Sequence, residues 1–218
     1  MTLPPLSLLQ TRVLGVLVEK QLTVPDTYPL TLNALVSGCN QKSSRDPVIE
    51  ASEDEVQSAV DQLKSLSLVM ESSGGRVMRY AHNVQRVLEI PAQAVAILTL
   101  LMLRGPQTAG ELRIHTERLH RFSDISAVEG FLHELEARAG GGLVMELPRQ
   151  AGARETRWSH LLSGAPQVST PVEAAPAPDR VAVGELAALR ATVDDLRAQL
   201  LAMRADVDRL LTELGISR

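Results

Sequence analysis

The sequence predicts a mainly helical fold with small β-hairpins, of the α+β class, and three observations support this. An order of three amphipathic helices and one hairpin occurs twice within the first 163 residues. A stretch rich in proline and alanine follows at 164–182, which is typical of a linker. An unbroken heptad pattern then occupies 183–216 and predicts a coiled-coil helix. The predicted domains before the linker are 1–87 and 88–163.

Composition excludes several classes of protein. The chain has 218 residues, 22 Lys+Arg against 26 Asp+Glu and a net charge of −4, so it is not a strongly basic nucleic-acid-binding chain. Two Tyr, two Phe and one Trp are too few for an aromatic platform that stacks single-stranded bases. A single cysteine, Cys39, excludes an intrachain disulfide and a cysteine-based zinc site. We expect a cytoplasmic protein, because no apolar run approaches membrane-spanning length.

The first copy of the repeat begins with an amphipathic helix that follows Pro4-Pro5. Pro29 is expected to open the second helix. Ser52 and Glu55 form a capping box that starts the third helix. Apolar residues on both sides of 72–75 predict a hairpin. The buried face of the third helix is predicted to be Val56, Ala59, Val60, Leu63 and Leu66.

The second copy repeats this order. Its first helix is predicted to end at Gly105-Pro106, and Thr108 with Glu111 supplies the capping box of its second helix. The third helix starts after either Asp124, which matches the position of Ser52, or Ser126, which forms the better capping box. Strands are predicted at 143–147 and 156–160. Three helices and a hairpin, in this order, form a winged helix-turn-helix domain, so the sequence predicts two such domains in tandem.

The C-terminal segment has apolar residues spaced alternately by three and four positions, as in a coiled-coil seam. Arginines occupy its e positions, and Glu185 at g would lie beside Arg190 of a parallel partner helix. We expect self-association as a dimer, and the alternative is that the stripe packs back on the globular part. The seam consists of Leu186, Leu189, Val193, Leu196, Leu200, Met203, Val207, Leu210 and Leu214.

Two pairs of sequence motifs carry a family resemblance. The run from Tyr28 to Leu35 precedes Asn40–Pro47, and Gly110–Arg113 precedes Arg118–Phe122. With these motifs the chain resembles the YceH-like family of uncharacterised bacterial proteins over roughly residues 7–163. The resemblance implies a tandem winged-helix fold and a hypothetical nucleic-acid role, without a known activity.

Binding of double-stranded DNA through the third helices looks unfavourable. Acidic residues outnumber basic ones on both helices, and carboxylates repel phosphate. A DNA footprint would therefore lie on loops and wings. Its candidate residues are Lys42, Arg45, Arg76, Arg79, Arg149, Arg154 and Arg157. The alternative is a protein–protein adaptor, resembling ScpB-type condensin accessory proteins.

The motif Asn40–Pro47 has two interpretations. Its polar side chains could bond the backbone of an irregular connection, or Lys42 and Arg45 could present donors to a phosphate or acidic partner. We expect no enzyme, cofactor or metal site, because the histidines lack ligand spacing and Gly140–Gly142 lacks the lysine of a phosphate-binding loop.

Overall fold

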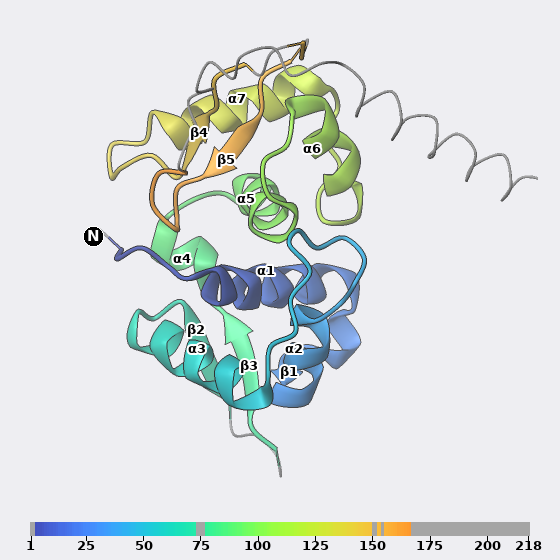
Figure 1. Cartoon of the computed structure of the whole chain (residues 1–218), viewed down its shortest axis with the longest axis vertical. Helices are drawn as coiled ribbons and strands as arrows, with labels where there is room; N and C mark the ends of the chain where they lie inside the picture. The colour runs from blue at the N-terminus through green and yellow to red at the C-terminus, as the bar shows by residue number, and fades with distance from the viewer. Residues whose placement is uncertain (1–2, 73–76, 150–151, 154, 167–218) are drawn as a thin grey trace, which may run out of the picture. The chain divides into compact units, whose positions relative to one another are not determined.

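A computed structural model describes residues 3–72, 77–149, 152–153 and 155–166. In these ranges seven α-helices and two small antiparallel sheets confirm the predicted α+β class (Figure 1). None of the helices described is long and apolar enough to cross a membrane. Nearly all of the predicted linker and the whole predicted coiled-coil helix lie outside the described residues.

The first repeat consists of α1 (Leu8–Thr23), α2 (Leu32–Cys39), α3 (Glu53–Ser65), β2 (Val69–Ser72) and β3 (Arg79–His82). The predicted capping box of α3 is confirmed. The Glu55 amide donates to Ser52 Oγ at 3.3 Å, and the Ser52 amide donates to Glu55 Oε2 at 2.7 Å. The predicted inner face is buried at Val56, Val60 and Leu63.

The second helix begins later than the sequence predicts. A 3₁₀ turn at Pro25–Thr27 precedes a short strand β1 (Leu30–Thr31), which pairs antiparallel with β3. Thr31 then caps α2, because its Oγ1 accepts a hydrogen bond from the Ala34 amide at 3.3 Å. The expectation that Pro29 opens the helix is therefore wrong, since pairing with β3 holds this segment extended. The resulting sheet has the order β1-β3-β2.

The second repeat consists of α5 (Ala92–Arg104), α6 (Ala109–His115), a 3₁₀ turn (Thr116–Arg118), α7 (Ile125–Glu136), β4 (Val144–Glu146) and β5 (Trp158–His160). A short helix α4 (Val84–Leu88), which the sequence analysis did not predict, precedes α5. Of the two possible caps of α7, the structure has Asp124, whose Oδ1 accepts from the Ala127 amide at 2.8 Å.

Helix α1 of the first repeat and helix α5 of the second pack against each other (Figure 1). Both are buried on almost all sides, and Val13, Leu17, Ile97 and Leu98 are among the inaccessible residues. The helices approach closely at Gly15, where an added Cβ would lie 2.8 Å from two carbon atoms of Leu103. The apolar residues of both repeats thereby form one continuous core.

Candidate functional site

The loop 40–47 is anchored at both ends by buried polar contacts. Arg12 of α1 has no solvent exposure, and it donates from Nη1 to the Cys39 carbonyl at 3.1 Å and from Nη2 to the Pro47 carbonyl at 2.6 Å. The Asn40 side chain makes two hydrogen bonds with the Ala51 backbone, each of 2.8 Å. These contacts satisfy backbone groups of an irregular segment, which would otherwise be costly to bury.

Arg45 lies inside this loop and is 6% exposed. Its Nη1 and Nη2 atoms donate to the two carboxylate oxygens of Glu19 at 3.2 and 2.6 Å, and Nε donates to the Gly38 carbonyl. Burial raises the pKa of Glu19, but the hydrogen bonds and charge of Arg45 outweigh this and hold the pKa below its usual value. The Arg45 donors are thus directed at α1 and α2 and not at solvent.

The same loop also contacts the second repeat. The Asp46 amide donates to the Leu103 carbonyl at 2.8 Å, and Arg104 Nη2 donates to Ser44 Oγ at 2.7 Å. The loop therefore connects α1, α2 and the end of α5. Of its two basic residues, Lys42 is exposed and Arg45 is buried, so the contacts favour the structural interpretation of this motif.

The basic residues of the hairpins are distributed over separate surfaces. Arg79 is exposed on β3 and donates to the Pro29 carbonyl at 2.7 Å. Arg157 donates to the Pro106 carbonyl at 2.7 Å and pairs with Glu111 at 3.1 Å. Arg149 is exposed next to β4. The remaining candidates, Arg76 and Arg154, lie outside the described residues.

The outward surface of α3 is acidic. Glu53, Asp54 and Asp61 are exposed, and the basic residue of this helix, Lys64, is held between two carboxylates. Lys64 Nζ lies 3.5 Å from Asp61 Oδ1 and also pairs with Glu71 of β2. These carboxylates raise the pKa of Lys64, with the hydrogen bond to Glu71 contributing most. The helix therefore presents little accessible positive charge.

A groove of about 290 Å³ runs between α7 and the second hairpin, meaning β4, β5 and the described residues between them. We call it the α7 groove. Helix α7 contributes Ile125, Glu129 and His133, which follow each other at intervals of four residues and so share one helix face. The hairpin contributes Glu146 and Glu155. Figure 1 shows α7 beside β4, with α6 next to it.

Trp158 forms a buried wall of the α7 groove, and its ring meets that of His133 edge-on at a centroid distance of 5.3 Å. Arg149 and the first residues of α6, Ala109 and Gly110, also line the α7 groove. Three carboxylates thus face one guanidinium among the described residues that line the groove.

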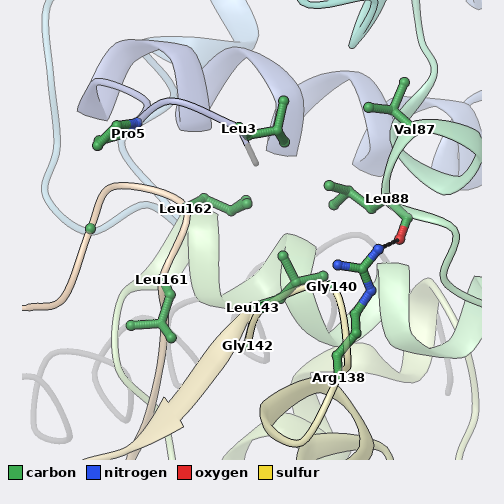
Figure 2. A pocket seen from close by; sticks show the side chains of 12 residues that line it. Leu3, Pro5, Val87, Leu88, Arg138, Gly140, Gly142, Leu143, Leu161 and Leu162 are labelled. Carbon is green, nitrogen blue, oxygen red and sulfur yellow. Dashed lines mark hydrogen bonds between the residues drawn. The ribbon is translucent and has the colours of Figure 1, made fainter. Parts of the chain in front are cut away.

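A second cavity, of about 150 Å³, lies between the N-terminal segment, α4 and the loop that follows α7 (Figure 2). Leucines dominate its wall, and Arg138 is the charged residue among the described residues that line it. Figure 2 shows the guanidinium of Arg138 turned toward the Leu88 carbonyl, to which it donates at 2.6 Å. Arg138 thereby joins the end of α7 to α4, which is a structural role.

Sequence reasoning missed Arg12 and Glu19, the two residues that hold the loop 40–47. A signal for Arg12 was present, because it occupies a helical position next to Val13 and one turn before Val16, on the apolar side of α1. Glu19 carries no comparable signal, since a charged residue near a helix end is usually solvated. The α7 groove was also missed, because its residues come from three segments of the chain.

Curated relatives match nearly the whole chain, and a family model matches the larger part of it. The family model described as "Protein of unknown function, DUF480" matches residues 6–153. A UPF0502 protein of Methylibium petroleiphilum is 61% identical over 212 residues, which cover 97% of this chain and 91% of the relative. A UPF0502 protein of Dechloromonas aromatica is 58% identical over 202 residues, covering 93% and 94%. One of Leptothrix cholodnii is 55% identical over 212 residues, covering 95% of each chain.

Proposed function

Because the chain belongs to the DUF480 family, whose description assigns no function, we propose its function from its own surfaces: it is a non-enzymatic, tandem winged-helix module that binds another protein. Each repeat has the helix–helix–helix–hairpin order of a winged-helix domain. In such domains the third helix is the element that usually enters the major groove of DNA. The surface charge of α3 and α7 therefore bears most directly on whether the protein binds DNA or another protein.

The observation that carries the proposal is the acidity of both third helices. Helix α3 exposes Glu53, Asp54 and Asp61, while its lysine is paired with Asp61 and Glu71. Helix α7 exposes Glu129, Glu134 and Glu136. Neutralisation of phosphates by Lys and Arg supplies most nonspecific affinity for DNA, so these faces would repel a duplex.

Apolar side chains on the second repeat also support binding of a protein. Ile114 on α6 is 67% exposed, and Ile125 at the start of α7 is 46% exposed. Exposed apolar side chains can supply the apolar centre of a protein interface, whose rim is polar. These exposed side chains favour the adaptor over a DNA-binding protein.

Site-specific photocrosslinking tests the proposal. A benzophenone amino acid replaces Ile114 in the full-length protein inside bacterial cells, and we expect discrete adducts that a protease removes and a nuclease does not. The matched control is Val48, which is 52% exposed on the first repeat. Adducts that contain DNA, or no protein adduct from position 114, would contradict the proposal.

DNA binding through loops and wings is the second candidate, because Lys42, Arg79 and Arg149 are exposed. Fluorescence anisotropy with a random duplex at two salt concentrations separates it from the first. If these residues contact phosphates, replacing one by alanine should lower the slope of log K against log salt by about 1. Dissociation constants weaker than about 100 μM at 150 mM salt would exclude this candidate.

Self-association through the heptad segment 183–216 is the third part of the proposal. Its support is the sequence pattern alone. A dimeric module would present its binding surfaces twice, which raises the avidity for a partner that is itself multivalent.

A further inference from the structure

We infer that the α7 groove binds a lysine or arginine side chain of a partner protein, from a segment that also carries an apolar residue. This inference rests on the proposed function, for which it names the binding site and the chemistry of the partner. The groove lies on the surface that joins α6, α7 and the second hairpin. The nature of the occupant follows from the charges of the groove, from its volume and from the space that Gly110 leaves open.

The charges select a cation. Glu129 approaches the groove from α7, Glu146 from β4 and Glu155 from the connection between the strands, so the carboxylates surround it from different elements. Among the described residues that line the groove, Arg149 offsets one of the three. Glu146 is oriented by Thr156, whose hydroxyl donates to its Oε1, and its own amide donates to Glu136 Oε1 at 3.4 Å. Complementary charge of this kind guides which partner binds.

The volume of the groove suits the side chain of a basic residue better than a small ion. Trp158 lines the groove but is only 4% exposed, so its ring offers an occupant little surface and the carboxylates must bind the cation. The groove, of about 290 Å³, has room for the hydrocarbon portion of a lysine or arginine, whose charged end would reach the carboxylates. Ile125 lies at the same groove, partly exposed, and offers contact to an apolar neighbour of that residue.

Gly110 keeps the groove open beside α6. A Cβ built at this position would lie 3.7 Å from Thr108 Oγ1 and 3.8 Å from Glu155 Oε2, which are ordinary contact distances. A small side chain therefore fits here without strain, and a longer one would extend toward Glu155. Gly110→Gln consequently fills the groove without removing any of its charges.

Trp158 is the single tryptophan of the chain and lines the groove, so its fluorescence reports occupancy directly. The probe is a synthetic 15-residue helical peptide of Leu and Lys without aromatic residues, and the comparison peptide has Glu in place of Lys. We expect a saturable change in Trp158 emission with the basic peptide, weakened by added salt, and no change with the acidic one. The double variant Glu129→Gln/Glu146→Gln should bind the basic peptide about fivefold more weakly, and Gly110→Gln similarly.

Glu134→Gln is the matched control, because Glu134 is exposed on α7 but does not line the groove. Its affinity should equal that of the unmodified protein. No saturable emission change up to 1 mM basic peptide, or equal weakening by Glu134→Gln and by the groove variants, would overturn the inference. If the protein adducts at position 114 persist in Gly110→Gln and in the double variant, the adaptor function stands and the groove is not its binding site.

Discussion

Glu19 and Arg45 form a bidentate ion pair inside the first repeat, with Oε1–Nη1 and Oε2–Nη2 distances of 3.2 and 2.6 Å. The Arg45 side chain is fully buried and that of Glu19 is 15% exposed. Two parallel hydrogen bonds fix both the position and the orientation of the guanidinium. The pair thus ties α1 to the loop 40–47, which in turn contacts α5 of the second repeat.

Removing one partner of this pair should be strongly destabilising. Glu19→Ala leaves the Arg45 guanidinium buried without its counter-charge, and we expect a loss of about 3 kcal/mol in the free energy of unfolding. Urea denaturation at pH 7 measures it. The double variant Glu19→Ala/Arg45→Met should recover part of the loss, because no uncompensated charge remains. A loss below about 0.5 kcal/mol for the single variant would show that the pair is dispensable.

The ion pair of Glu19 with Arg45 also predicts how the stability of the fold depends on pH. The pKa of Glu19 is lower in the folded protein than its ordinary value of 4.5, so its stabilising contribution is complete above 4.5 and is lost as the pH falls through the folded value. Glu19→Gln should therefore reduce the loss of stability on acidification below pH 4.5. Denaturation midpoints measured at pH 5 and pH 3 give this difference, and an unchanged pH dependence would contradict it.

His82 predicts a second, separate pH window. Burial lowers its pKa from 6.5 to about 4, while Nδ1 accepts from the Val84 amide at 3.3 Å and Nε2 lies 2.6 Å from Gln21 Oε1. The unfolded chain takes up the proton first, so stability is complete above pH 6.5 and decreases from there toward pH 4. His82→Gln should flatten this decrease, as seen by thermal unfolding at pH 7 and pH 5. Burial lowers the pKa of His160 to about 4 as well, so some decrease should remain.

The matched control for His82 is His133→Gln, whose side chain is 64% exposed. This substitution should leave the decrease between pH 7 and pH 5 as it is in the unmodified protein. An equal flattening by both substitutions would mean that burial of His82 is not the cause.

Two helical glycines should respond oppositely to the same substitution. At Gly15 an added Cβ meets Leu103 at 2.8 Å inside the contact of α1 with α5, whereas at Gly130 on α7 nothing lies within 4 Å. Gly15→Ala should lower the free energy of unfolding by about 1 kcal/mol after the gain in helix propensity. Gly130→Ala should raise it by about 0.5 to 1 kcal/mol. Denaturant midpoints of the two variants compare them directly, and stabilisation by both would show that α1 and α5 can separate at no cost.

The heptad pattern predicts a dimer, which charged residues introduced into the seam should disrupt. Leu196→Asp/Leu200→Asp places carboxylates at a and d positions, where burial of an unpaired charge costs several kcal/mol. We expect the mass from light scattering to fall from that of a dimer to that of a monomer. Ala198→Asp, at the outward f position, should leave the mass unchanged. A dimeric mass for the double variant would show that the seam does not set the oligomeric state.

Local sequence signals were sufficient where neighbours in the chain decide the structure. Ser52 with Glu55 and Thr108 with Glu111 predicted both capping boxes correctly, since each box needs only residues three positions apart. Gly105 predicted the end of α5 for the same reason. Pro29 was misjudged, because a strand far along the chain, β3, pairs with the two residues that follow it. The local signal at Pro29 could not contain that pairing.

The sequence by itself therefore determined the fold class, the order of the six main helices and two hairpins, the family and the acidity of the third helices, but not the short elements β1 and α4. Only the tertiary structure decided which charges remain available. Arg45 and Arg157 are bonded to Glu19 and Glu111, residues 26 and 46 positions away, while Lys42, Arg79 and Arg149 remain exposed. It also brought Glu129, Glu146 and Trp158 together around one groove. The physical reason is that the energy of a charge depends on burial and on its partners in space, neither of which a linear pattern specifies.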